Sequence, residues 1–451
     1  MTRPPDIAVV GAGAAGLAAA KALLEEGLTV TVFELGDRPG GLWVQDNPSG
    51  LSPAYDSLHL NTSKGRTEFA AHPMPAEWPD YPAAGAIAGY LQGYADRFGV
   101  TEHIRFGTEV TAVERTDDGW SVSSRTAGTD AVDRFDAVVV ANGHNWDPRW
   151  PDPAYPGSFA GEQVHAHDYR SADRFAGKRV LVVGMGNSAM DIAVDASYVG
   201  SAPVLLSARH GTHIVPKYLF GRPADATGGA IAALPWRIRQ RLAETMLRLA
   251  VGTPESYGLP KPAGGLFQNH PTISDTILHR LTHGEVVPRP GIERFDGTRV
   301  HFTDGTVDEV DVIVWATGYR VTIPFLSARW LGDDAERMPL YQRVFRLDDP
   351  SLAFVGLMQS TGAALPVVEA QANLAAAYLA GRYALPAPEQ QRAAVDSAHR
   401  AAVERWGRKR PMMRIDFDQY VGAIPKELEA GRARARRGAP TFSPRRQEAT
   451  A

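Results

Sequence analysis

The sequence predicts an α/β protein with two Rossmann-like dinucleotide-binding domains, the second inserted into the first. Two glycine-rich turns, GAGAAG at 11–16 and GMGNSA at 184–189, carry this prediction. Each turn follows a short apolar run and precedes an alanine-containing segment of helical length. A strand, turn and helix in this order bind a nucleotide pyrophosphate at the N-terminus of the helix. Two such turns, named here the first and second cradles, indicate that electrons pass between two bound cofactors.

Both cradles belong to units with the same order of strand, turn, helix and strand. The helix of the first unit ends at Gly27, a residue typical of helix C-termini. Two further strands, at 137–140 and 312–316, each run into a glycine-containing turn. The predicted strand, helix and strand are 7–10, 17–26 and 29–33 in the first unit and 179–183, 189–198 and 204–206 in the second.

The repeated units suggest the division of the chain into domains. We assign residues 1–170 and 300–382 to the first domain and residues 171–299 to the second. Residues 210–275 are rich in proline and glycine, and we expect an irregular insertion near the substrate. Residues 383–451 form a C-terminal helical extension with an arginine-rich tail. We expect the tail to be flexible and solvated rather than a binding patch; its arginines are Arg432, Arg434, Arg436, Arg437, Arg445 and Arg446.

Composition excludes several classes of function. The chain of 451 residues is 44% apolar and 22% charged, as in ordinary globular proteins. Its net charge of −4 produces no strong field toward nucleic acid or an acidic membrane surface. With no cysteine, it has no disulfide, no thiolate metal site and no thiol pair for a disulfide reductase. No metal ligand set is apparent.

The pattern of apolar residues bears on location. A strand begins by Ile7, which leaves no room for a signal peptide, and no apolar run approaches the roughly 18 residues of a membrane span. We therefore expect a cytoplasmic protein with no membrane or nucleic-acid partner. A homodimer is compatible with the sequence.

The first cradle is followed by an acidic residue at the distance that dinucleotide binding requires. Glu34 lies 23 residues after Gly11, at the end of the next strand, where it can accept hydrogen bonds from both hydroxyls of an adenosine ribose. Gly40 and Gly41 would let the following loop approach the cofactor. Trp43 is assigned to the cofactor, with a plain core aromatic as the alternative.

The second cradle differs at its end and at the end of its second strand. Ala189 stands where the first cradle has its last glycine, and Ser207-Ala208-Arg209 closes the strand without an acid. An acid there would repel a 2′-phosphate, whereas Arg209 would attract it through a forked, charge-assisted contact. The second cradle should therefore prefer NADPH. The alternative is that Arg209 is a surface cation.

Between the cradles lies a spaced pattern, Phe159-x-Gly161-x3-His165-x3-Tyr169, that resembles the fingerprint of flavin-containing monooxygenases. Further stretches resemble motifs of that family in the same order, over about residues 5–382. They are Asn61-Thr62-Ser63-Lys64, Gly184 to Asp191, Ala316-Thr317-Gly318-Tyr319, Leu340-Tyr341-x-Arg343-Val344-Phe345, Phe354-Val355-Gly356 and Glu369-x-Gln371.

The resemblance implies FAD in the first cradle and NADPH in the second. It further implies that the reduced flavin reacts with dioxygen to give a peroxyflavin, which transfers one oxygen atom to nitrogen or sulfur of a small molecule. In such chemistry the protein positions the cofactor and excludes water. Asn61, whose amide offers two donors, is our candidate catalytic residue, with a turn-capping role as the alternative. His165 and Tyr169 would form a hinge between the domains, or else a linker histidine beside a core tyrosine.

The predicted site combines these assignments. The cofactor-binding residues are Gly11, Gly13, Gly16, Glu34, Gly41, Trp43, Gly184, Gly186, Asn187, Ser188, Ser207, Arg209 and Gln359, and the fingerprint residues are Phe159, Gly161, His165 and Tyr169.

Two alternative functions stay open. Baeyer–Villiger monooxygenases resemble the same pattern but carry Trp where Tyr169 stands, followed by Pro or Asp rather than Arg170, which disfavours ketone oxidation. A nucleotide-binding protein without turnover is the other alternative, and two intact cradles with Asn61 and Arg209 count against it. The sequence does not identify the substrate, because the pocket-lining residues fall in irregular segments.

Overall fold

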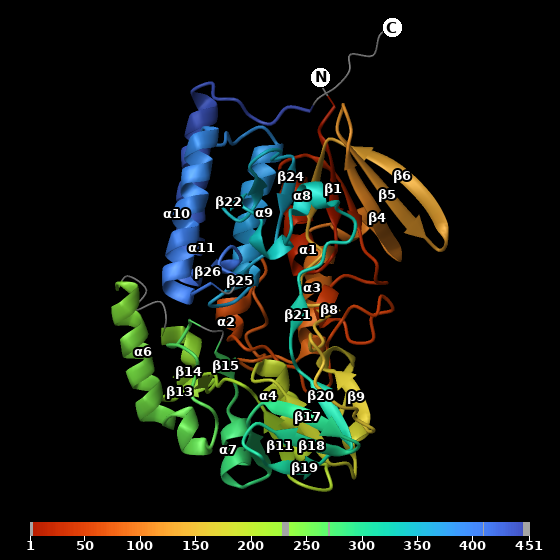
Figure 1. Cartoon of the computed structure of the whole chain (residues 1–451). Helices are drawn as coiled ribbons and strands as arrows, with labels where there is room; N and C mark the ends of the chain where they lie inside the picture. The colour runs from red at the N-terminus through yellow and green to blue at the C-terminus, as the bar shows by residue number, and fades with distance from the viewer. Residues whose placement is uncertain (1–2, 228–233, 269–270, 409, 445–451) are drawn as a thin grey trace.

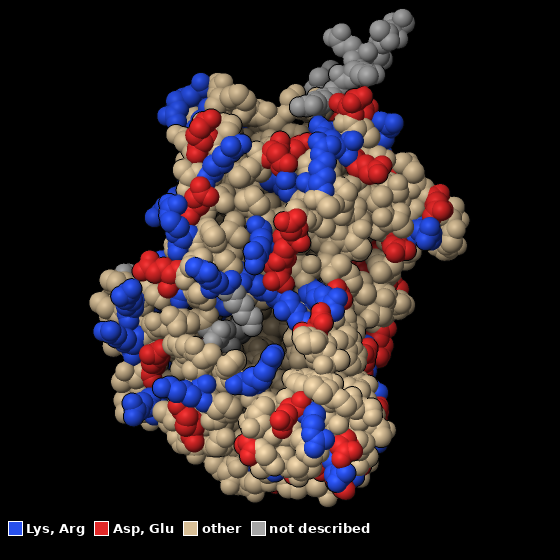
Figure 2. Space-filling model, viewed as in Figure 1, with Lys and Arg blue, Asp and Glu red and all other residues tan. Residues whose placement is uncertain are grey.

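The computed structural model describes residues 3–227, 234–268, 271–408 and 410–444. A mixed, mostly parallel sheet and a fully parallel sheet form the centres of two domains, which lie one above the other in Figure 1. Figure 2 shows a hollow between the upper and lower parts on this face, with Lys and Arg side chains at its border. None of the helices among the described residues has the length and apolar character required to span a bilayer.

The first sheet has seven strands and carries the first cradle at the end of β1, an interior strand. Strand β1 pairs in parallel with β2 on one side and β7 on the other. All four residues of β7 are buried, as expected for a parallel strand that is covered on both faces. The order is β22 (Leu340–Tyr341), β23 (Phe345–Arg346), β24 (Leu352–Phe354), β7 (Ala137–Val140), β1 (Asp6–Val10), β2 (Thr29–Phe33) and β3 (Ile104–Arg105).

Helices and a small sheet cover the two faces of this first sheet. On one face, α1 (Ala14–Glu25), α3 (Ala84–Arg97) and α9 (Leu365–Leu379) share one core with the sheet, and the small side chains of α1 and α9 allow these two helices to pack closely. On the other face, the antiparallel strands β4 (Thr108–Arg115), β5 (Trp120–Thr126) and β6 (Thr129–Phe135) contribute to a second core.

The second sheet has five parallel strands and carries the second cradle. Alternate residues of its strands face α4 (Asn187–Ser197) and α7 (Thr276–Thr282) on one side. On the other side they face the antiparallel sheet of β17 (Ile292–Asp296), β18 (Arg299–Phe302) and β19 (Val307–Glu309). The order is β16 (Val286–Arg289), β11 (Val204–Ser207), β10 (Val180–Val183), β20 (Val312–Trp315) and β9 (Glu162–His165).

The pairing of β9 and β20 corrects the predicted domain boundaries. Both strands belong to the second sheet, so that sheet includes residues that we assigned to the first domain, before 171 and after 299. The apolar run at 312–316 is a strand as predicted, but its composition suits either sheet. Only its register with β10 shows which sheet it joins.

Two further regions differ from the sequence prediction. The expected irregular insertion contains a helix of 16 residues, α6 (Trp236–Val251). The C-terminal extension contains two long helices, α10 (Pro388–Trp406) and α11 (Phe417–Arg436). Helix α11 also includes part of the tail that we expected to be flexible. There, Arg434 forms an ion pair with Glu427 at 2.5 Å, which stabilises this end of the helix. Arg445 and Arg446 lie outside the described residues.

Short elements connect these layers. They are α2 (Lys64–Thr67), α8 (Ala328–Leu331), β8 (Asp147–Pro148), β12 (Ile214–Val215), β13 (Tyr218–Leu219), β14 (Arg222–Pro223), β15 (Thr272–Ile273), β21 (Tyr319–Arg320), β25 (Gln359–Ser360) and β26 (Arg414–Ile415).

Candidate active site

Two glycines of the first cradle are required by the fold itself. Gly11 has a φ of +103°, and a Cβ there would lie 2.7 Å from the carbonyl oxygen of Ala141, just after β7. A Cβ on Gly16 would lie 1.7 Å from the carbonyl oxygen of Gly11. Any side chain at either position would force the sheet and α1 apart.

The middle glycine, Gly13, is different, because a Cβ there would make only an ordinary van der Waals contact. Its φ of −72° suits any residue, and a Cβ there would meet only the Cα of Gly41, at 3.6 Å. Gly41 has a φ of +57°, and its own Cβ would come within 2.9 Å of the Cα of Gly13. The backbones of Gly13 and Gly41 therefore approach each other at the N-terminus of α1 with no side chain between them, an arrangement that suits close approach of a pyrophosphate.

Glu34 holds the first cradle together. Its Oε2 accepts the N–H of Ala12 at 2.6 Å, and its Oε1 accepts the N–H of Gly36 at 2.7 Å. The side chain is buried, and burial raises the pKa of its carboxyl group. A carboxylate has further lone pairs beyond these two bonds, so it can still accept from ribose hydroxyls. Trp43 is partly buried and packs against the core around α1, and its contact with a cofactor stays a prediction.

The second cradle repeats the geometry of the first. Gly184 has a φ of +142°, and a Cβ there would lie 2.4 Å from the carbonyl oxygen of Ala316, which follows β20. Gly186, at the position that corresponds to Gly13, has no atom within 4 Å of the position of a Cβ. Ala189 is fully buried where the first cradle needs Gly16, so this cradle accommodates one methyl group.

The predicted residues around the second cradle have different partners. Ser207 is buried, and its hydroxyl donates to the carbonyl of Pro290 at 2.6 Å. Arg209 is exposed, and its guanidinium pairs with no carboxylate in the described part of the chain. Its side-chain stem passes close to Gly291, whose Cβ would lie 2.9 Å from Cγ of Arg209. Arg209 is thus an unpaired cation after β11, as the prediction of a 2′-phosphate contact requires.

The insertion lies against the second cradle, a contact that sequence reasoning missed. The hydroxyl of Thr272 donates to the carbonyl of Met185 at 2.5 Å, inside the cradle. The N–H of Ile273 donates to Oδ1 of Asn187 at 2.8 Å. The side chain of Asn187 thus anchors β15, while Ser188 lies half-buried in the first turn of α4.

Asn61 lies in a turn that other residues stabilise. The hydroxyls of Thr62 and Thr67 are hydrogen-bonded at 2.8 Å, and Thr67 also donates to the carbonyl of Ser63 at 2.9 Å. Asn61 itself is half-buried, and its amide has no hydrogen-bond partner among the residues that the structure describes. The turn-capping alternative is therefore not supported, and the amide is free for a bound molecule.

The insertion also reaches the turn of Asn61. The N–H of Ser63 donates to Oδ2 of Asp225 at 2.7 Å, and the hydroxyl of Tyr81 donates to the carbonyl of Lys217 at 2.5 Å. The segment 217–225 thus lies beside Asn61, and the segment 272–273 lies beside the second cradle.

Comparison with known proteins decides the family. The model of the flavin-binding monooxygenase-like family matches residues 5–432. Rat flavin-containing monooxygenase 5 is 34% identical to this chain, and the alignment covers 89% of this chain and 78% of the rat protein. The chain belongs to the flavin-binding monooxygenase-like family. It is a flavoprotein monooxygenase.

Solved structures agree in fold. The S-allyl-L-cysteine S-oxygenase of Allium sativum has a TM-score of 0.71 and 25% identity, covering 98% of this chain and 90% of that one. The cyclohexanone monooxygenase of Rhodococcus sp. Phi1, bound to NADP+, has a TM-score of 0.70 at 20% identity, covering 96% and 98%. At this lower identity, the second comparison shows the fold alone.

In this monooxygenase, the fingerprint residues are structural contacts between segments. The ring of Phe159 lies over Gly161, where a Cβ would come within 2.6 Å of Cζ of that ring. His165 is fully buried at the end of β9, and its Nδ1 accepts the N–H of His167 at 3.0 Å. Burial lowers the pKa of His165 to about 4, so the ring is neutral at pH 7. This matches the alternative of a hydrogen-bonded linker histidine.

Tyr169 joins a polar network that ties the helix of the second cradle to the first domain. Its hydroxyl donates to Oδ2 of Asp195 at 2.8 Å, and Ser57 donates to the same oxygen at 2.5 Å. Tyr55 donates to Oδ2 of Asp191 at 2.7 Å. Because Tyr55 and Ser57 precede the turn of Asn61 in the chain, this network links that turn to α4. The two aspartates had no assigned role in the sequence prediction.

The same network leads to a pH-dependent prediction. Burial, with a smaller contribution from Asp195, raises the pKa of Asp191 from 3.8 to about 6, against opposing contributions from Tyr55 and Lys217. A raised carboxyl pKa means that the folded state prefers the protonated form, so stability falls as the pH rises from 3.8 to about 6. Asp191→Asn keeps an acceptor for Tyr55 without the charge. We expect it to stabilise the enzyme by about 1–3 kcal/mol at pH 7.5, and by progressively less toward pH 4.

Chemical unfolding of the holoenzyme across this pH range measures the effect, with Tyr55→Phe as the control that removes only the hydrogen bond. A difference between Asp191→Asn and wild type that does not change with pH would show that packing, rather than the buried charge, is responsible.

The predicted Gln359 lies in β25, where its N–H donates to the carbonyl of Met413 at 2.8 Å. Gln371 is fully buried and holds the turn before β25, because its Oε1 accepts the N–H of Gly356 at 2.8 Å. The glutamine of the Glu369-x-Gln371 motif therefore positions the backbone that leads to Gln359.

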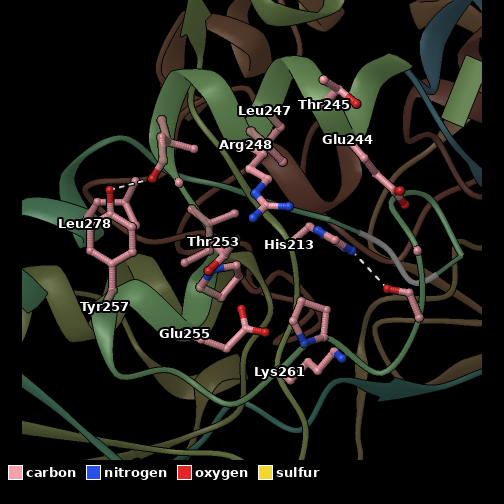
Figure 3. A pocket seen from close by; sticks show the side chains of 17 residues that line it. His213, Glu244, Thr245, Leu247, Arg248, Thr253, Glu255, Tyr257, Lys261 and Leu278 are labelled. Carbon is pink, nitrogen blue, oxygen red and sulfur yellow. Dashed lines mark hydrogen bonds between the residues drawn. The ribbon is translucent and has the colours of Figure 1, made fainter. Parts of the chain in front are cut away.

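A cavity of about 380 Å³ lies inside the insertion, beside α6 (Figure 3). Figure 3 shows His213, Arg248, Glu255 and Lys261 around the same space, so its charges are of both signs. The Nε2 of His213 is bonded to the carbonyl of Gly264 at 2.9 Å. No residue assigned to either cofactor lines this cavity, which is separate from the two cradles.

Proposed function

We propose that this monooxygenase transfers one oxygen atom from dioxygen to nitrogen or sulfur of a small molecule, with FAD bound at the first cradle and NADPH at the second. The assignment of the two cofactors rests on the residues that end the second strand of each unit, which differ between the two cradles. The first cradle has Glu34, an acceptor for ribose hydroxyls, and the second has the unpaired cation Arg209. The resemblance to an S-oxygenase at 25% identity supports oxidation at sulfur. A cytoplasmic location, a homodimer and the absence of nucleic-acid partners stay predictions from the sequence.

The amide of Asn61 would act on the bound flavin or NADP+. It is half-buried and free of protein partners among the described residues, and the segment 217–225 of the insertion lies beside its turn. Preorganised amide donors in a site that excludes water stabilise negative charge on a bound group. FAD accepts hydride from NADPH and activates dioxygen when it is bound. In this proposal Asn61 holds the oxidised nucleotide or stabilises charge near the flavin.

One experiment separates the proposal from both alternatives. The holoenzyme is incubated with NADPH and, in separate reactions, a small tertiary amine, an aryl sulfide or a cyclic ketone. NADPH consumption and oxygenated product are then quantified together. We expect N-oxide or sulfoxide in proportion to NADPH oxidised. Lactone as the main product would establish the Baeyer–Villiger alternative, and no oxygenated product from any substrate would favour the non-catalytic one.

Arg209 should determine the preference for NADPH over NADH. A charge-assisted contact is worth about 1.5–3 kcal/mol, so Arg209→Ala should reduce the preference roughly ten- to hundredfold. The loss should appear mainly in KM for NADPH and leave NADH little changed. Gly291→Ala offers an independent check, because its methyl group would displace the stem of Arg209 and should give a smaller loss of the same kind. Equal losses for the two nucleotides in Arg209→Ala would show that Arg209 does not contact the 2′-phosphate.

A further inference from the structure

A second cavity, of about 280 Å³, is lined mainly by the C-terminal extension. None of its lining residues was assigned to a cofactor, although Gln359 of β25 pairs with Arg414 of β26. The cavity is formed where α10 and α11 meet the strands β22 and β26. One part of its lining is apolar and includes Val395, Trp406 and Ile415. The other part is basic and consists of Arg343, Arg405 and Arg414. A cavity of this size is slightly below the usual range of small-molecule sites, roughly 300–1,000 Å³.

Arg343 is a buried cation with little compensation. Its residue is only 6% exposed, and its guanidinium donates to the carbonyl of Pro411 at 3.3 Å. No carboxylate of the described residues pairs with it, and burial lowers its pKa. Gln342 and Arg343 also have φ values of +52° and +58°, a left-handed conformation that costs free energy in residues other than glycine. The fold thus keeps the guanidinium of Arg343 in the cavity wall despite two unfavourable contributions to stability. One is the burial of a charge without a carboxylate partner, and the other is the left-handed backbone at this residue.

Arg414 is a second buried cation in the same wall. It is 7% exposed, donates to the carbonyl of Phe267 at 2.7 Å and lies 5.3 Å from the ring centroid of Trp406. Burial lowers its pKa to about 10. The one acid that lines the cavity, Asp416, forms a buried ion pair with Arg239. The carboxylate of Asp416 is therefore already neutralised, and among the described residues the charges of Arg343 and Arg414 are not.

Buried charges are retained in proteins when something pairs with them. Each guanidinium has five N–H donors. Among the described residues, one carbonyl accepts a hydrogen bond from Arg343 and one from Arg414, so most of their donors are available to a ligand. Forked pairs of guanidinium donors match the two oxygens of a carboxylate. We propose that this cavity binds a small organic anion, with its carboxylate held by Arg343 and Arg414 and its apolar body against Val395, Trp406 and Ile415.

Isothermal titration calorimetry on the FAD-loaded enzyme tests the proposal with octanoate as the probe. We expect saturable binding of one octanoate per chain, weaker binding of inorganic phosphate and no binding of octanol, which lacks the charge. Arg343→Met and Arg414→Met should each weaken octanoate binding roughly ten- to hundredfold. Arg400→Met, which removes the same charge from an exposed position on α10 outside the cavity, should leave binding unchanged.

Thermal unfolding without octanoate distinguishes a ligand-binding arginine from a structural one. Methionine at 343 makes the same backbone demand as arginine, so the comparison reports on the guanidinium. We expect the Tm of Arg343→Met to equal or exceed that of wild type, because an uncompensated buried charge is removed. If Arg343→Met does not fold, Arg414→Met provides the binding test.

Four results would overturn the proposal. They are no saturable octanoate binding to the wild-type enzyme, octanol or phosphate binding as tightly as octanoate, an equal loss of binding in Arg400→Met, and a Tm of folded Arg343→Met well below that of wild type.

Discussion

Gly13→Val is expected to produce a folded protein that does not retain FAD. The backbone at Gly13 has a φ of −72°, which valine adopts readily, and a Cβ there would meet only the Cα of Gly41. The isopropyl group would instead occupy the space through which the pyrophosphate must pass. We expect the flavin that copurifies with the protein to fall at least about tenfold, measured as the ratio of flavin to protein absorbance.

The second cradle supplies the matched control for this variant. Gly186 has a φ of −83°, and a Cβ there would have no neighbour within 4 Å, so valine is tolerated by the fold in the same way. Gly186→Val should keep its FAD and its yellow colour while losing flavin reduction by NADPH. Full FAD occupancy in folded Gly13→Val would show that the first cradle does not bind the flavin. Loss of FAD in Gly186→Val would reverse the assignment of the two cradles.

Asn61→Ala should uncouple NADPH consumption from oxygenation. Its amide donors have no protein partner among the described residues, so their removal changes the bound state rather than the turn, which Thr62 and Thr67 maintain. Loss of one preorganised donor typically costs about 10²–10³-fold in the step that it assists. Anaerobic flavin reduction by NADPH should stay within a few-fold of wild type. With substrate and oxygen present, we expect hydrogen peroxide to replace most of the oxygenated product.

Two variants separate the amide from the turn. Asn61→Asp preserves the shape but removes the donors, and it should uncouple as Asn61→Ala does. Thr67→Val removes the hydroxyl that holds the turn and leaves the amide of Asn61 intact, so it should affect stability more than coupling. If Asn61→Ala forms product in full proportion to NADPH oxidised, Asn61 has no catalytic role. If Thr67→Val uncouples to the same degree, the effect belongs to the conformation of the turn.

Much of the cofactor site was predictable because its signals are local. A glycine that must adopt positive φ, such as Gly11, and an acid at the end of the next strand, such as Glu34, lie within one strand–helix–strand unit. The apolar runs of β2 and β7 likewise show in the sequence, and the structure confirms both. Local steric demands and the periodicity of apolar residues do not depend on the rest of the chain, so they can be interpreted residue by residue.

The domain boundaries and the tail depended on contacts between distant segments. The run at 312–316 is apolar enough for either sheet, and pairing with Val180–Val183 places it in the second. The tail around Arg434 has the composition of a solvated end, yet the ion pair of Arg434 with Glu427 and its bond to the carbonyl of Ala384 keep it helical and packed. Composition reports an average tendency, whereas these positions are decided by specific partners.

The sequence alone therefore determined the two glycine-rich cradles and the family, since these rest on short motifs whose geometry is set by neighbouring residues. The tertiary structure alone brings Tyr55 to Asp191 and Arg343 to the cavity of Arg414. Each of these pairs joins segments that are far apart in the sequence. Asp191 and Arg343 become buried only once the intervening elements have packed. Burial then raises the pKa of Asp191 and keeps Arg343 in a cavity wall where no carboxylate of the described residues pairs with it.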